Sequence, residues 1–147
     1  MGWFNLYGLI FVAVIMIPNI VFAAKCKDGF ENVWKNKFVE AVEQTGRFAC
    51  FILMVFNVPL LTFGFWFENA LTVYLVADGV LVALYCIVWI ILFNKPGILR
   101  ALCLSVLPSV LFLFSGIIIT SIPLIVAALV FAPSHIVISY KNARISR

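Results

Sequence analysis

Hydrophobic and polar positions alternate in long blocks along the chain, with five apolar stretches separated by short polar segments. An α-helix of about 20 apolar residues crosses the roughly 30 Å of hydrocarbon in a bilayer, and each stretch is of about this length. We therefore predict an all-α membrane protein, in which a bundle of five transmembrane helices forms a single transmembrane domain over residues 1–147. The predicted spans cover residues 3–24, 39–63, 70–93, 98–119 and 123–140.

The polar segment after the first predicted span contains apolar residues at helical spacing. Phe30, Val33, Trp34 and Phe38 are separated by lysines and other polar residues. This pattern is typical of a helix that lies at the membrane surface with its aromatic side chains in the lipid. We predict a short amphipathic surface helix over about residues 30–38.

The Lys and Arg residues are confined to alternate connections. Five spans place the first connection, the third connection and the C-terminal tail on one side of the membrane. Lys and Arg favour the cytoplasmic side, so the N-terminus is predicted to lie outside and the C-terminus in the cytoplasm. The ten basic residues are Lys25, Lys27, Lys35, Lys37, Arg47, Lys95, Arg100, Lys141, Arg144 and Arg147.

The composition excludes a soluble domain. The chain is 65% hydrophobic and 11% charged, whereas a soluble domain has about 45–50% apolar and about 25% charged residues. We expect a multi-pass protein of the cell membrane, whose partners are the lipid bilayer and either further copies of itself or a larger membrane complex. The net charge of +4 does not indicate nucleic-acid binding, because the basic residues flank apolar segments instead of forming one polar surface.

The first candidate site is a polar layer in the cytoplasmic half of the bundle. Glu43 and Arg47 are four residues apart with the acid first, which favours an ion pair on one helix. Asn19 and His135 lie at a similar helix rise from the nearest basic residue of the inner end. We predict that these four residues form a layer open to the cytoplasm, in which His135 changes charge near neutral pH. The alternative is an interfacial stripe whose side chains reach water, with His135 only joining two helices.

The second candidate site is Asp78, well inside the third predicted span. A charged Asp in hydrocarbon costs about 2.5–3.5 kcal/mol on insertion scales, so this side chain should face the bundle or water. Tyr74 lies one turn earlier on the same helix face, and Asn57 of the second span is a candidate partner. Asp78 either binds a proton or cation, or is a neutral acid bonded to a Tyr or Asn.

No catalytic motif, metal site or cofactor site is indicated, and we predict none. The four cysteines form no C-x-x-C pair and all lie in the predicted cytoplasmic half, where thiols stay reduced. They are Cys26, Cys50, Cys86 and Cys103.

Two classes of function remain, and a third is weaker. The buried polar residues favour a small transport or channel-like protein with a cytoplasm-facing polar cleft. The small size favours, about as strongly, a non-catalytic accessory, immunity or assembly partner of a larger membrane complex. A lipid-modifying membrane enzyme is supported only by His135 near Glu43 and Arg47 at the depth of the inner headgroups.

Overall fold

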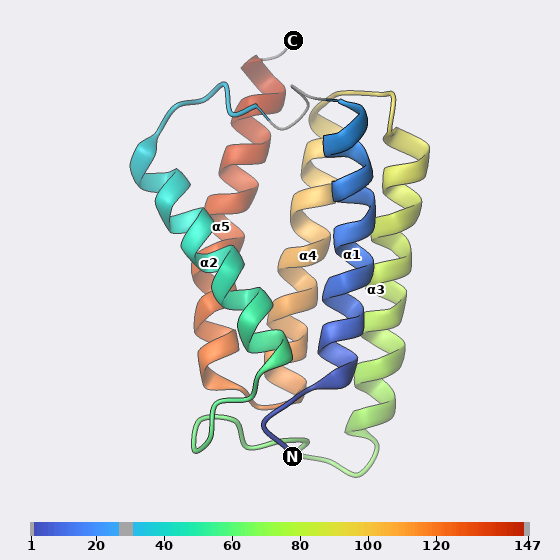
Figure 1. Ribbon diagram of the computed structural model, residues 1–147, viewed down its shortest axis with the longest axis vertical. Coiled ribbons are helices and arrows are strands. Elements are labelled where there is room, and N and C mark those ends of the chain that lie inside the picture. Colours follow the sequence, from blue (N-terminus) through green and yellow to red (C-terminus); the bar gives the residue numbers. More distant parts are fainter. Residues whose placement is uncertain (1, 27–30, 146–147) are drawn as a thin grey trace.

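A computed structural model describes residues 2–26 and 31–145 and forms a bundle of five α-helices (Figure 1). Four of them, α1, α3, α4 and α5, are long and apolar enough to cross a membrane. The described residues contain two isolated β-bridges and no strand, so the predicted all-α class is confirmed. The helices are α1 (Leu6–Lys25), α2 (Lys37–Val55), α3 (Ala70–Leu92), α4 (Ile98–Ile118) and α5 (Ile122–Ile145).

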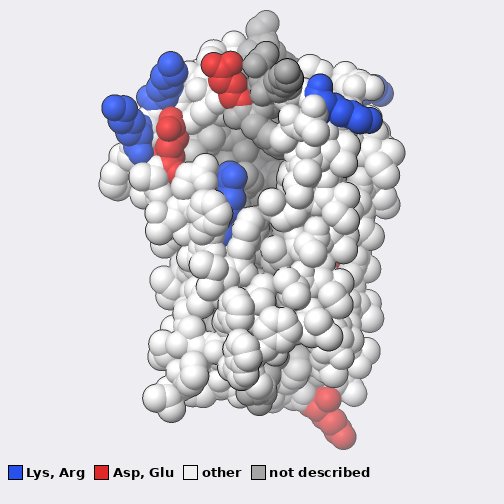
Figure 2. Space-filling view, in the orientation of Figure 1, with Lys and Arg blue, Asp and Glu red and all other residues white. Residues whose placement is uncertain are grey.

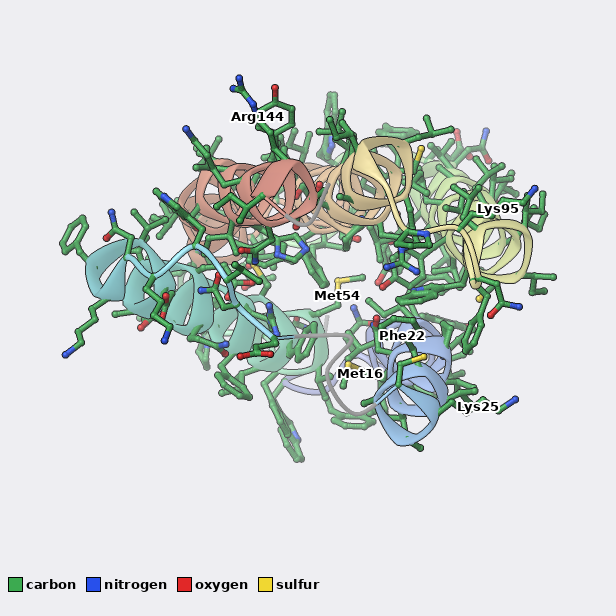
Figure 3. All side chains as sticks on the ribbon, turned by 90° about the horizontal axis from the view of Figure 1, so that it is seen from above. Met16, Phe22, Lys25, Met54, Lys95 and Arg144 are labelled. Atoms are coloured by element: carbon green, nitrogen blue, oxygen red, sulfur yellow. The ribbon has the colours of Figure 1, made fainter. Side chains whose placement is uncertain are left out.

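The order of the helices around the bundle differs from their order in the chain. Helix α4 packs between α3 and α5, α5 also packs on α2, and α1 packs on α3 and α2 (Figure 3). Helix α2 is inclined, so that its end approaches the start of α1 while its first half leans away from α1 (Figure 1). The two helices therefore meet at one end of the bundle and diverge toward the other.

The contact between α1 and α2 is made by backbone atoms. The backbone nitrogen of Asn5 donates to the carbonyl oxygen of Val55 at 2.7 Å. One turn into α1, a Cβ built on Gly8 would lie 1.9 Å from the carbonyl oxygen of Met54. Only a residue without a side chain fits at this crossing, so Gly8 allows the two helices to touch.

The second helix is shorter than the sequence predicts. The predicted span covers residues 39–63, but the helix ends at Val55. The backbone nitrogen of Asn57 then donates to the carbonyl oxygen of Trp3 at 2.8 Å, and residues 61–64 pair with the turn between α4 and α5. These bonds satisfy backbone groups outside a helix, which sequence periodicity does not reveal. Because its first turns are polar, α2 is not one of the four helices that are apolar enough to cross a membrane.

The predicted surface helix is not formed over the described residues 31–36, and α2 begins directly after them. The backbone nitrogen of Trp34 donates to Asn142 Oδ1 at 2.8 Å, which holds the segment against α5. Asn36 then caps the first turn of α2 with its side chain. Phe30, the first residue of the predicted helix, lies outside the described residues.

The remaining helices follow the predicted spans closely. Helices α3 and α4 begin at the predicted residues and end one residue early. Helix α1 begins later than predicted because Asn5 Oδ1 accepts a hydrogen bond from the backbone nitrogen of Gly8 and caps the helix. Helix α5 continues to Ile145, beyond the predicted end at residue 140.

The described Lys and Arg residues lie in one half of the bundle, where α1, α3 and α5 end and α2 and α4 begin (Figures 1 and 2). We call this the basic end. Glu68 lies at the opposite end, in the connection that precedes α3. Lys27 and Arg147 lie outside the described residues.

Candidate functional site

Three of the four residues predicted to form the polar layer meet between α2 and α5. Glu43 Oε1 accepts hydrogen bonds from Arg47 Nε at 3.0 Å and from Arg47 Nη2. The same oxygen lies 2.9 Å from His135 Nδ1 on α5. Because a carboxylate can only accept, His135 carries a proton on Nδ1 in this contact. We call these three residues the Glu43 cluster.

The local sequence explains why the cluster forms. Arg47 follows Glu43 by one helical turn, so both side chains lie on one face of α2. Gly46 lies between them, and a Cβ there would stand 2.9 Å from the Cα of Phe131. The backbones of α2 and α5 are therefore close at this point. One turn further along α5, the His135 ring stacks on Phe131 with centroids 4.6 Å apart.

Exposure differs sharply within the cluster. The side chain of Glu43 is 3% exposed, that of His135 19% and that of Arg47 36%. The Glu43 side chain is therefore almost fully enclosed by protein. Arg47 provides the accessible part of the cluster, and only some of its five N–H donors are used by Glu43.

Asn19 makes its bonds elsewhere. Its Oδ1 accepts from the Tyr85 hydroxyl of α3 at 2.9 Å, and its Nδ2 donates to the carbonyl oxygen of Ile15 at 2.9 Å. Tyr85 thus joins α3 to α1. The sequence could have indicated Tyr85, because it lies two turns after Asp78 on the buried face of α3.

One face of the bundle is hollowed. The space-filling view shows a recess between α1 and α2 toward the basic end, where the two helices diverge (Figure 2). Met54 near the end of α2 and Phe22 near the end of α1 are buried and point into the space that the helices enclose (Figure 3). Apolar side chains thus occupy part of this space, both near the basic end and near the end of α2.

Asp78 is fully buried, at 0% exposure, and faces α4. Its Oδ2 accepts a hydrogen bond from the Ser115 hydroxyl at 2.5 Å. The predicted partner Asn57 is not used, because it follows the end of α2 and its side chain donates to the carbonyl oxygen of Gly2 at 2.7 Å. Asp78 lies in the third turn of α3 and Ser115 in the last turn of α4. Asp78 and Ser115 therefore lie at different depths along their own helices, and a comparison of these depths would not predict their contact.

Tyr74 lies one turn from Asp78 on the same buried face of α3. Its hydroxyl accepts a hydrogen bond from Asn5 Nδ2 at 3.1 Å, and its ring packs edge-on against Phe11. Tyr74 therefore joins α3 to the start of α1. Sequence reasoning missed Asn5 because it precedes the helix as a capping residue.

Neither a metal site nor a disulfide is formed by the described residues. No group of three or more His, Cys, Asp or Glu side chains among them could hold a metal ion. The four cysteines are free thiols.

Removing the Tyr85 hydroxyl tests its bridging position. Tyr85→Phe is expected to lower the free energy of unfolding by about 1 kcal/mol, because Asn19 Oδ1 loses the hydrogen bond that it accepts. Tyr140→Phe, near the end of α5, is the matched control and should change stability by less than about 0.5 kcal/mol. Unfolding in detergent measures both variants. Equal stability of the two would contradict a bond between α1 and α3.

The comparisons with known proteins identify no relative. No protein-family model matches the chain, and neither a curated protein nor a solved structure is detectably similar to it.

Proposed function

We propose that the chain is a small transport or channel-like protein of the cell membrane, with a cytoplasm-facing polar cleft built around the Glu43 cluster. The observation that carries the proposal is a carboxylate with 3% exposure that is paired with Arg47 and His135 while Arg47 stays 36% exposed. Ionisable groups inside membrane helices are costly and are usually kept for a function. The unused N–H donors of Arg47 would contact a polar or anionic ligand.

We further propose that α2 crosses the membrane as a fifth span, with the basic end in the cytoplasm. The pairing of Glu43 with Arg47 and His135 lowers the cost of placing these groups in the membrane. The remaining charged residues of α2, Lys37 and Glu40, lie in its first turn at the basic end. Positively charged residues favour the cytoplasmic side, which supports an N-terminus outside and a C-terminus in the cytoplasm.

A cysteine-accessibility experiment tests the cleft. In a variant with all four native cysteines replaced by Ala, Asn19→Cys is expected to react with a charged, membrane-impermeant thiol reagent. Ile20→Cys is the matched control, because Ile20 is adjacent in α1 but 60% exposed on the surface that would face lipid. It should react at least about tenfold more slowly, since a thiol in hydrocarbon does not ionise. Equal rates would argue against a water-filled cleft.

Two further cysteines determine the orientation in the same experiment. Arg144→Cys, near the end of α5, should react only when the reagent reaches the cytoplasmic side. Glu68→Cys, at the opposite end, should react only from outside. Reaction of position 144 from outside intact cells would reverse the proposed topology.

The other functions lead to different results. An accessory, immunity or assembly partner needs no water-filled cleft, so position 19 would be unreactive and a second protein would co-purify in mild detergent. A lipid-modifying enzyme would change the covalent structure of added lipid, and variants of His135 would abolish that reaction.

A further inference from the structure

One carboxyl group in the bundle interior is separate from the Glu43 cluster. Asp78 is 0% exposed, and its Oδ2 is bonded to the Ser115 hydroxyl of α4. Its second oxygen, Oδ1, has no hydrogen-bond partner among the described residues. An ionised carboxylate has about four acceptor positions and normally fills several of them. The surroundings of Asp78 provide one bond.

The neighbouring helices provide no compensating positive charge. Helices α1 and α4 are the elements that pack against α3. The charged residue of α1 is Lys25, at its end, and the charged residue of α4 is Arg100, at its start. Both lie at the basic end, and about 22 Å of helix rise separates Arg100 from Ser115. Within the described residues Asp78 forms no salt bridge.

The titratable neighbour of Asp78 is a phenol. Tyr74 lies one turn away on the same buried face of α3, and its hydroxyl accepts a hydrogen bond from Asn5. A neutral phenol does not offset the charge of a carboxylate. An ionised Asp78 would therefore be desolvated without compensation, which is far more costly than burying a neutral acid.

The protonated acid fits the observed contacts. A proton on Oδ2 donates to Ser115 Oγ with no change in the positions of the two oxygens. The Ser115 hydroxyl is then free to donate to a carbonyl oxygen one turn back in α4, as Ser does in membrane helices. Oδ1 becomes the carbonyl oxygen of a neutral group, for which a missing partner costs less than for a charged one.

We propose that Asp78 is a proton-binding site and carries its proton at neutral pH. The site lies between the Asn5–Tyr74 bond and the Tyr85–Asn19 bond, and the apolar Val82 separates it from Tyr85 on the buried face of α3. Loss of the proton would create an uncompensated charge in the bundle and would favour a conformation that admits water. A role as the coupling site for transport rests on the proposed function, whereas the bound proton does not.

Infrared spectroscopy of the purified full-length protein at neutral pH tests the proposal. A protonated carboxyl has a C=O stretching band that an ionised carboxylate lacks. The band is expected in the wild-type protein and should be lost in Asp78→Asn. Glu43→Gln and Glu68→Gln should retain it, because they remove an ion-paired and an exposed carboxylate. Absence of the band from the wild-type protein, or its persistence in Asp78→Asn, would overturn the proposal.

Ser115→Ala provides a second measurement that keeps Asp78 in place, should Asp78→Asn fail to fold. Loss of the hydrogen bond from the acid should move the band to higher frequency. An unchanged frequency would assign the band to another carboxyl and would reject the site. If the band behaves as expected but Asn19→Cys does not react, then Asp78 carries a proton and the water-filled cleft is rejected. The two proposals can therefore fail separately.

Discussion

Replacing Glu43 by Leu is expected to lower the free energy of unfolding by about 3 kcal/mol, the largest effect of any single change in the polar cluster. The substitution leaves the guanidinium of Arg47 and the ring of His135 without the carboxylate that both contact. Removing one partner of a buried ion pair costs about 3–5 kcal/mol. The lower end of that range applies because Arg47 is 36% exposed and partly hydrated.

The double variant Glu43→Leu/Arg47→Leu separates the loss of the pair from the cost of an unpaired charge. It should recover most of the stability, because apolar side chains can replace a buried ion pair at little cost. Glu68→Leu, which changes an exposed Glu at the other end of the bundle, should shift stability by less than about 0.5 kcal/mol. Titration of the purified protein with a denaturing detergent measures all three. If the double variant is as unstable as Glu43→Leu, then the loss of stability does not come from leaving the charge of Arg47 unpaired.

Gly8→Val is expected to separate the ends of α1 and α2 and to destabilise the bundle by about 3 kcal/mol. A Cβ at this position would overlap the carbonyl oxygen of Met54 at 1.9 Å. Overpacking a core costs about 1–3 kcal/mol when side chains can adjust, and the upper value applies because a backbone atom must move here. The displacement would also strain the bond from the Asn5 nitrogen to Val55.

Gly79→Val is the matched control for this substitution. Gly79 also lies inside an apolar helix, but a Cβ there would meet nothing within 4 Å. Its replacement should leave stability within about 0.5 kcal/mol of the wild-type value. Thermal unfolding in detergent compares the two variants, and about 2–4 °C per kcal/mol is expected for a chain of this length. Equal shifts would mean that α1 and α2 do not cross as closely as Gly8 indicates.

The positions of most helices could be predicted from the sequence because a membrane helix needs an uninterrupted apolar run. Ala70 and Ile98 are the first residues of α3 and α4, and both follow turn residues that end the preceding polar connection. The gathering of basic residues at one end follows from their placement in alternate connections. The Glu43–Arg47 pair is also local, since residues four apart on a helix face each other. The early end of α2 is different, because its last backbone groups bond to residues before α1.

Only the tertiary structure decided which polar residues meet. Helix rise gives the depth of a residue along its own helix, but neither the rotation of that helix nor its neighbours. A helix that is apolar on all sides carries little information about which face turns inward. His135 therefore reaches Glu43 through the packing of α2 on α5 that Gly46 permits, while Asn19 pairs with Tyr85. Asp78 likewise bonds to Ser115 and not to Asn57, because α4 and not α2 packs against this face of α3.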